Sequence, residues 1–283
     1  MTLFTQFSKN TEIFYKTDEE IELIRKSCLL VSKTLAHVAS RIRPGIKGSV
    51  IDKEAEELIR SHEGAIPGFK GYNDFPSTLC VSVDEVVVHG IPSDEEFKDG
   101  QIVSVDCGVF WNGFYGDAAY TFAVGDVDEE TMDLLRVTNT SLYKGIEMAI
   151  HGKRLGDIGH AIQNYTQRQH NYSVVRELVG HGLGKNLHED PEVANYGKRG
   201  SGILMKEGMV IAIEPMINLG RKEVKQSTDG WTIYAKDRKP SAHYEHSVAV
   251  RKDKADILSS HEGVEEEILK NPNVKEVSIL EKI

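Results

Sequence analysis

Cysteine and long apolar runs are what this sequence has least of. Its 283 residues include three cysteines, a sparse and odd set that does not make a disulfide framework and that favours a reducing compartment. No stretch approaches the roughly 18 apolar residues of a membrane span, and residues 1–16 lack the long apolar run of a signal peptide. We therefore expect a cytoplasmic protein without a membrane partner.

An excess of basic residues is also missing. The formal net charge is −10, from 34 Lys and Arg against 44 Asp and Glu, and both signs are mixed along the chain. This charge pattern disfavours nucleic acid or an anionic membrane as the main partner. The sequence also lacks a Ser-, Gly- or Pro-rich linker, and its length suits one large α/β domain with an ample core.

Helix-like and strand-like segments follow one another in a repeated order. Thr17 and Glu20 form a capping box, after which apolar residues recur at helical spacing as far as Ile42. Two helices followed by strands then occur twice. Helices are expected at 17–42, 49–62, 129–150 and 157–169, strands at 78–89, 101–124, 173–179, 209–218, 231–235 and 242–250, and a short helix at 261–270.

This repeated order suggests an internal duplication. A shift of the numbering by 107 places Gly45 on Gly152 and Ile51 on Ile158, although the remaining residue match is weak. The same shift carries Asp106 to position 213, next to Glu214. Acids at equivalent strand positions in two related halves would meet at the axis that relates the halves, so we expect one fused domain.

The segment 101–124 predicts a hairpin with two acids on one face. Asn112-Gly113 is typical of a two-residue turn, which would place Asp106 opposite Ala119. Because strand side chains alternate, Asp117 shares the face of Ala119 and becomes a diagonal neighbour of Asp106. Two acids in an apolar hairpin are costly unless a cation or a shared proton compensates them. Alternatively, one or both acids lie at a strand end in water.

The second half supplies three more polar candidates. His181 lies in a glycine-rich segment, Glu214 interrupts an apolar strand before Pro215, and Glu245 lies in another strand. Each alone has an ordinary explanation as a solvated or surface residue. Together with the two aspartates they are typical of a site for two hard-to-borderline cations, since four carboxylates offset the charge of two divalent ions.

Six short motifs in this order resemble type I methionine aminopeptidase, from about Lys16 to Lys252. They are His89-Gly-Ile-Pro92, Asp106-Cys-Gly108, Gly116-Asp117, Gly180-His-Gly-Leu-Gly184 with His188 seven residues after His181, Ile213-Glu-Pro215 and Tyr244-Glu-His246. The resemblance implies an α/β (α+β) pita-bread fold, in which helices back a curved antiparallel sheet of two pseudo-symmetric halves. We expect an N-terminal extension at 1–16, a catalytic domain at 17–252, and a dispensable charged C-terminal extension at 253–283.

The resemblance also implies roles for individual residues. His89 corresponds to a histidine that contacts the scissile amide nitrogen, His188 to one that contacts the substrate carbonyl, and Glu214 to a group that accepts a proton from water. Two divalent ions, Co, Mn, Fe or Zn, are expected on Asp106, Asp117, His181, Glu214 and Glu245. The methionine pocket is expected to be lined by Tyr72, Phe75, Cys80, Leu187 and Trp231.

The activity that this resemblance implies is metal-assisted removal of the initiator methionine from nascent proteins, with a small second residue favoured. The implied partners are N-terminal Met peptides and, transiently, the ribosome, and the implied state is a monomer. Phe69, Ala118 and Leu178 depart from the family pattern, which leaves the pocket shape open.

Three alternatives compete with this interpretation. An aminopeptidase P or prolidase shares the fold and metal set but usually has a large N-terminal domain, for which the roughly one hundred residues before Asp106 leave little room. A non-enzymatic pita-bread binding protein would have lost its metal ligands, whereas all five are present here. An unrelated fold would need these spacings to coincide by chance. Residues 182–213 also leave no room for the insertion of type II relatives.

Overall fold

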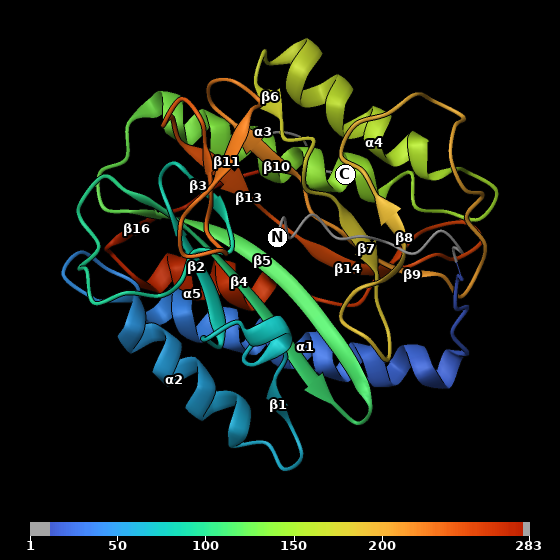
Figure 1. Ribbon diagram of the computed structural model, residues 1–283, viewed down its shortest axis with the longest axis horizontal. Helices are drawn as coiled ribbons and strands as arrows, with labels where there is room; N and C mark the ends of the chain where they lie inside the picture. Colours follow the sequence, from blue (N-terminus) through green and yellow to red (C-terminus); the bar gives the residue numbers. More distant parts are fainter. Residues whose placement is uncertain (1–11, 280–283) are drawn as a thin grey trace.

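A long antiparallel hairpin crosses the structure, a computed structural model that describes residues 12–279 (Figure 1). Strands β4 (Ile102–Trp111) and β5 (Phe114–Val124) meet at Asn112-Gly113, where both residues have positive φ, 54° and 84°. This is the backbone that a type I′ turn requires. The register pairs Asp106 with Ala119, so the predicted hairpin is confirmed.

Short strands extend this hairpin into a five-stranded sheet. Strands β1 (Ile66–Pro67) and β2 (Leu79–Val83) pair with β4, and β16 (Val274–Lys275) pairs with β5. Strand β3 (Val86–Val88) belongs instead to a second sheet with β11 (Val224–Gln226) and β12 (Ile233–Ala235).

The second half contains a hairpin that is broken in the middle. Strands β9 (Val210–Ile213) and β10 (Met216–Asn218) run opposite β14 (His246–Ala249) and β13 (Ser241–His243), and the pairing is interrupted at 214–215 and 244–245. The remaining strands extend these two sheets. They are β6 (Ser173–Val174) beside β10, β7 (Gly180–Gly182) between β9 and β8 (Glu189–Val193), and β15 (Asp256–Ile257) beside β14.

Two groups of helices cover the strands. Helix α1 (Asp18–Arg41) begins with the predicted capping box at Thr17 and packs along the hairpin, beside α2 (Gly48–Arg60). Helix α3 (Glu129–Ile146) packs on α4 (Leu155–Gln163), which continues as a π-helix, Asn164–Gln169. In Figure 1 the pair α1 and α2 lies at the bottom and the pair α3 and α4 at the top, with strands between them.

The duplicated halves are recognisable in the second helix of each pair. Helix α2 begins at Gly48 and α4 at Leu155, a shift of 155 − 48 = 107 residues. Gly45 and Gly152 both have positive φ, 83° and 87°, which favours glycine at the turn before each helix. Isolated bridges, Lys47 with Glu96 and Arg154 with Leu204, anchor both helix starts. The predicted arrangement of two related halves is confirmed.

Some element boundaries differ from the predictions. The expected strand at 173–179 is reduced to Ser173–Val174, because the chain there leaves the sheet of β10 and joins the sheet of β9 at Gly180. The expected strand at 78–89 is two strands, since Asp84 turns the chain with a φ of 49°. Helix α3 ends at Ile146, before the expected 150. Within residues 12–279, no helix is long and apolar enough to cross a membrane.

Residues 253–279 pack on the domain. Helix α5 (Glu262–Lys270) lies against α1, and β15 and β16 each pair with a strand of the core. The side chain of Asn271 donates hydrogen bonds to the carbonyls of Ala39 and Ile42 at the end of α1, at 2.8 and 2.9 Å. This packing argues against the expectation that residues 253–283 are dispensable.

Adjacent residues of α5 provide a test of this packing. Ile268 is 3% exposed and Leu269 is 70% exposed. We expect Ile268→Ala to lower the free energy of unfolding by about 2–5 kcal/mol, because it leaves a cavity between α5 and the core. Leu269→Ala, the matched control, should have little effect. Urea denaturation of both variants measures the difference, and equal effects would show that α5 is not docked.

Candidate active site

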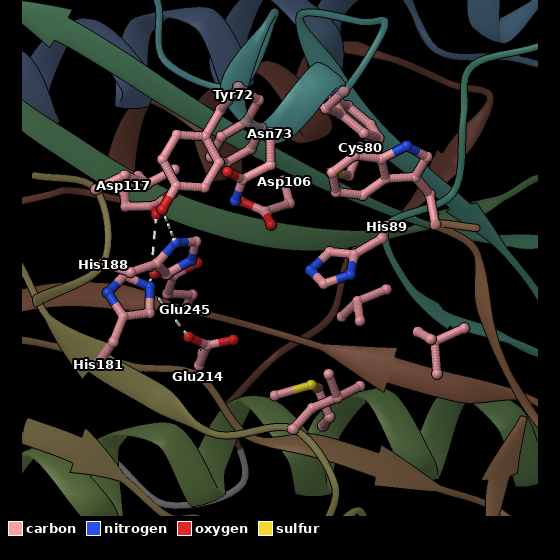
Figure 2. A pocket seen from close by; sticks show the side chains of 18 of the residues that line it. Tyr72, Asn73, Cys80, His89, Asp106, Asp117, His181, His188, Glu214 and Glu245 are labelled. Atoms are coloured by element: carbon pink, nitrogen blue, oxygen red, sulfur yellow. Dashed lines mark hydrogen bonds and ion pairs between the residues drawn. The ribbon is translucent and has the colours of Figure 1, made fainter. Parts of the chain in front are cut away.

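All residues that the sequence predicted for the site line one cavity between the two halves (Figure 2). The cavity measures about 140 Å³, a size that accommodates one benzene-sized group. Figure 2 shows acids and imidazoles turned toward one another in one part of the cavity, with aromatic rings beside them. The arrangement combines a polar centre with room for a single side chain.

The two hairpin acids share this polar centre. Asp106 lies in β4 and Asp117 in β5, and both line the cavity, as the alternation predicted. Their Oδ1 atoms are buried and have no hydrogen-bond partner among residues 12–279. Burial, together with the charge of Glu214, raises the pKa of Asp106 to about 7. Burial and the charge of Asp106 raise the pKa of Asp117 well above its ordinary range.

The two glutamates occupy the breaks in the second hairpin. Glu214 separates β9 from β10 and precedes Pro215, which has no N–H to continue the strand pairing. Glu245 separates β13 from β14, and its N–H donates to the carbonyl of Ala119 at 3.0 Å. Burial raises the pKa of Glu214 to about 7. Burial, and after it the charge of Asp117, raises the pKa of Glu245 well above its ordinary range.

His181 faces these acids from β7. Its Nδ1 lies 2.9 Å from the carbonyl of Gly182, which only a protonated Nδ1 satisfies, so the lone pair is on Nε2. That Nε2 lies 3.6 Å from Oε1 of Glu214 and 3.9 Å from Oδ2 of Asp117. A Cβ atom on residue 182 would lie 2.3 Å from the carbonyl of Asp190, so glycine is required where the strand turns this imidazole inward.

This set of side chains fits a metal ion. Potential ligand atoms of Asp117, His181 and Glu245 lie within 4.8 Å of one another. Buried carboxylate oxygens without partners, next to an imidazole lone pair, provide the oxygen and nitrogen donors that divalent transition metals bind. A bound cation would also compensate the burial of the acids, whose raised pKa values reflect their desolvation in its absence.

Two further histidines line the cavity in their neutral form. His89 follows β3 with a φ of 58°, and burial, with the charge of His243, lowers its pKa to about 4. The Nδ1 of His188 lies 2.9 Å from the hydroxyl of Tyr72, which leaves Nε2 for another partner. Burial, and then the charges of His181 and His89, lowers the pKa of His188 well below its ordinary value.

Aromatic and soft side chains form the rest of the cavity wall. The rings of Phe75 and Trp231 make an edge contact with centroids 5.1 Å apart, and the ring of Tyr72 lies 5.2 Å from that of His188. Cys80 and Leu187 complete the predicted lining. Phe69 and Leu178, which depart from the family pattern, also line the cavity.

Sequence reasoning missed several other lining residues. They are Asn73, Val88, Val179, Met216, Gln226, Gly230 and Ile233. Strand alternation from Glu214 could have found Met216. Asn73 in a short 3-10 helix, Gln226 at the end of β11 and Gly230 in a loop carry no local pattern, because only the tertiary fold brings their segments to the cavity.

His243 is a further residue that sequence reasoning missed. It is buried behind the cavity, and its Nε2 lies 3.6 Å from Oε2 of Glu214 without a hydrogen-bond partner in the described part of the chain. Thr121 fixes its backbone on both sides, accepting from the N–H at 3.0 Å and donating to the carbonyl at 2.6 Å. His243 is therefore held where it can orient Glu214.

Residues 22–252 match the model of metallopeptidase family M24. The chain belongs to metallopeptidase family M24. Among curated M24 relatives, it is 49% identical to the methionine aminopeptidase of Clostridium perfringens over 247 residues, which cover 87% of this chain and 98% of that one. The methionine aminopeptidase of Escherichia coli K12 is 39% identical over 248 residues, 87% of this chain and 94% of that one.

Solved structures of M24 enzymes share the fold. The methionine aminopeptidase of Rickettsia prowazekii matches with a TM-score of 0.86 and 39% identity, covering 88% of this chain and all of that one. The prolidase of Pyrococcus furiosus matches with a TM-score of 0.70 and 23% identity, covering 87% of this chain and 65% of that one, which shows the fold alone. The predicted pita-bread fold and the predicted resemblance to methionine aminopeptidases are confirmed.

The raised pKa of Asp106 predicts how pH affects the stability of the metal-free protein. Between about pH 4 and 7 the unfolded chain loses this proton and the folded chain keeps it. The contribution of this group to folding stability therefore falls as pH rises through this range. Buried neutral histidines such as His261, whose pKa is lowered to about 3, act in the opposite direction.

The comparison of wild type with Asp106→Asn separates these effects. In the presence of a chelator, we expect the variant to become progressively more stable than wild type as pH rises from 4 to 7, and the difference to level off above 7. Denaturant titrations across this range measure the difference. Parallel stability curves would show that Asp106 is not desolvated in the folded protein.

Proposed function

We propose that the chain is a methionine aminopeptidase that removes the initiator methionine from nascent proteins and favours a small second residue. One observation carries this proposal. A carboxylate and imidazole centre from the segments that carry the family motifs lies in one cavity with room for one apolar side chain, and all lining residues fall within the part of the chain that matches the family. Relatives at 39–49% identity over most of the chain bear this name, which supports the same activity here.

We further propose that the polar centre holds two divalent ions, Co, Mn, Fe or Zn. The five proposed ligands are Asp106, Asp117, His181, Glu214 and Glu245. Four carboxylates and one imidazole give a donor set that all four metals accept, and the four negative charges offset two divalent ions. When bound, such ions polarise a carbonyl group and activate water at neutral pH.

The side chains around this centre supply binding and proton transfer. Glu214, whose carboxylate lines the polar centre, is proposed to accept a proton from water there. His89, neutral because burial lowers its pKa to about 4, faces the cavity and is proposed to contact the leaving amide nitrogen. His188, oriented by Tyr72, is proposed to donate from Nε2 to the substrate carbonyl.

The apolar wall is proposed to select methionine. A flexible thioether fills an irregular cavity well and makes favourable contacts with ring edges. Tyr72, Phe75, Cys80, Leu187 and Trp231 provide such a wall. The second substrate residue would lie toward the polar centre, where a small side chain fits best. Selectivity between methionine and leucine is expected to be modest, because apolar pockets distinguish similar side chains by about 1–3 kcal/mol.

The cellular setting is part of the same proposal. Initiator methionine is accessible on nascent chains, so the substrate would be met in the cytoplasm, with transient contact to the ribosome. We propose that the enzyme acts as a monomer, since one chain contributes every side chain of the candidate site.

A direct assay tests the proposed activity. Metal-reconstituted protein should hydrolyse Met-Ala-Xaa peptides about 10- to 200-fold better than Leu-Ala-Xaa peptides, and it should leave Xaa-Pro dipeptides largely uncleaved. Preferential cleavage of Xaa-Pro substrates would favour a prolidase, whose fold this chain shares. Metal binding without any hydrolysis would favour a non-enzymatic binding protein.

Metal binding by Asp106 and Asp117 can be measured without catalysis. A ligand that binds only the folded state stabilises it by RT ln(1 + [L]/Kd), about 2.7 kcal/mol at a hundredfold excess over Kd. We expect Mn²⁺ or Co²⁺ to raise the melting temperature of wild type and of the exposed control Asp253→Asn alike. Asp106→Asn and Asp117→Asn should show much smaller shifts, because each lacks one charge that holds the ions. Equal shifts in all four proteins would exclude the two acids as ligands.

The metal content of a His89 variant distinguishes the proposed role of His89 from that of a metal ligand. We expect His89→Ala to retain both metal ions and to lose about 10²–10⁴-fold in turnover, since it removes a group that acts on the leaving amide. Elemental analysis and kinetics on Met-Ala-Xaa provide the two measurements. Unchanged turnover at full metal content would contradict the proposed role.

A further inference from the structure

A buried ion pair lies beneath the loop that carries His188. The Nζ of Lys16 is 2.5 Å from Oε2 of Glu189, and their side chains are 5% and 3% exposed. Glu189 directly follows His188, whereas Lys16 precedes the segment that matches the family model, which begins at residue 22. The pair therefore links the N-terminal segment to the cavity loop.

Backbone contacts fix both ends of the pair. The Nζ of Lys16 also donates to the carbonyl of Phe14 at 3.1 Å, and the Lys16 N–H donates to Gly208 at 2.7 Å. The second oxygen of Glu189, Oε1, accepts the N–H of Asn186 at 3.1 Å. Isolated bridges join Ile13 to Asp190 and Tyr15 to Met209. The segment 12–16 is thus attached both to the residue that follows Glu189 and to residues 208–209.

The ion pair fills the inside of the turn 184–187. A Cβ atom on residue 184 would lie 2.6 Å from both Oε1 of Glu189 and Cε of Lys16, so a side chain at this position would displace the ion pair. The carbonyl of Gly184 accepts a hydrogen bond from the N–H of Tyr115 at 2.8 Å. The N–H of Gly184 donates to the carbonyl of Asn186 at 3.2 Å. Leu187 and His188 then leave the turn and line the cavity.

We propose that the Lys16–Glu189 pair is a positioning element of the active site, which holds the turn 184–187 so that Leu187 and His188 face the substrate. Stability alone does not explain the pair, because desolvation of two buried charges offsets most of their attraction. The two charges do impose one geometry on the turn, since each is also fixed by the backbone. The role in catalysis rests on the proposed function, and the effect on loop geometry does not.

A double variant separates positioning from simple support of the fold. Lys16→Met or Glu189→Gln alone leaves a buried polar group without its partner and should lower the melting temperature. Lys16→Met/Glu189→Gln removes both charges and should recover most of that loss. We expect the double variant to keep its metal content and yet to lose about 10–100-fold in kcat/KM on Met-Ala-Xaa, through a lower kcat and a higher KM. Lys16→Arg, which keeps the charge, should lose less.

A second ion pair provides a matched control. Arg25 contacts Asp256 at 2.8 Å with partly exposed side chains, and it joins α1 to β15 without lining the cavity. Arg25→Met/Asp256→Asn should change stability and leave kcat and KM unchanged. Wild-type kinetics in the Lys16→Met/Glu189→Gln variant would overturn the proposal.

Hydrogen exchange gives a readout that does not depend on activity. In metal-loaded protein, the double variant should show faster exchange at Asn186, Leu187 and His188 than wild type or the control variant, with exchange in β4 and β5 unchanged. Unaltered exchange in this turn would overturn the proposal even if wild type does not cleave Met peptides. Absence of cleavage by wild type, with altered exchange, would count against the proposed function alone.

Discussion

Four carboxylates buried in one cavity without a compensating positive side chain are the constraint on which this structure depends. Within the described chain, no lysine or arginine lines the cavity that contains Asp106, Asp117, Glu214 and Glu245. Desolvation of several acids in one site disfavours their ionised forms, as their raised pKa values indicate. Two histidines that line the cavity do not offset this cost, because burial lowers the pKa of His89 and His188 and keeps both neutral. Only a bound cation would satisfy the acids in their charged state.

The backbone is shaped to bring these acids together. The first half contributes two acids from a continuous hairpin, where pairing across β4 and β5 places Asp106 and Asp117 on one face. The second half contributes Glu214 and Glu245 at the two breaks of its hairpin, where the interrupted pairing leaves space for their side chains. Neither half contributes all four acids by itself, so the cavity that contains them lies where the duplicated halves meet.

Much of this arrangement could be predicted, because it follows from local rules. The Asn112-Gly113 turn sets the register of its hairpin, and strand alternation then places Asp106 and Asp117 together. Spacing and family resemblance supplied His181, Glu214 and Glu245. The position of His243 could have been predicted in the same way, since it lies two residues before Glu245. It falls outside the motifs, however.

What could not be predicted depends on contacts between distant segments. Nothing local indicates that Lys16 meets Glu189, 173 residues later, or that residues after 252 pack on α1. Likewise, the strand expected at 173–179 is short because the chain passes from the sheet of β10 to the sheet of β9. Pairing with distant strands determines where it leaves the first sheet. Charged composition suggested a dispensable extension at the C-terminal end, but charge predicts exposure only where no buried partner exists.

Both ends of the described chain in fact support the strands that carry the site. At the C-terminal side, Nδ1 of His246 lies 2.7 Å from the hydroxyl of Ser259, and the rings of His246 and His261 stack with centroids 3.9 Å apart. Because His246 follows Glu245, these contacts fix the backbone at one of the strand breaks. At the N-terminal side, Lys16 fixes the turn before His188 in the same way. The broken strands and glycine-rich turns leave room for the acids but lack regular pairing of their own. Packing by segments outside the duplicated halves therefore holds these strands and turns in one geometry.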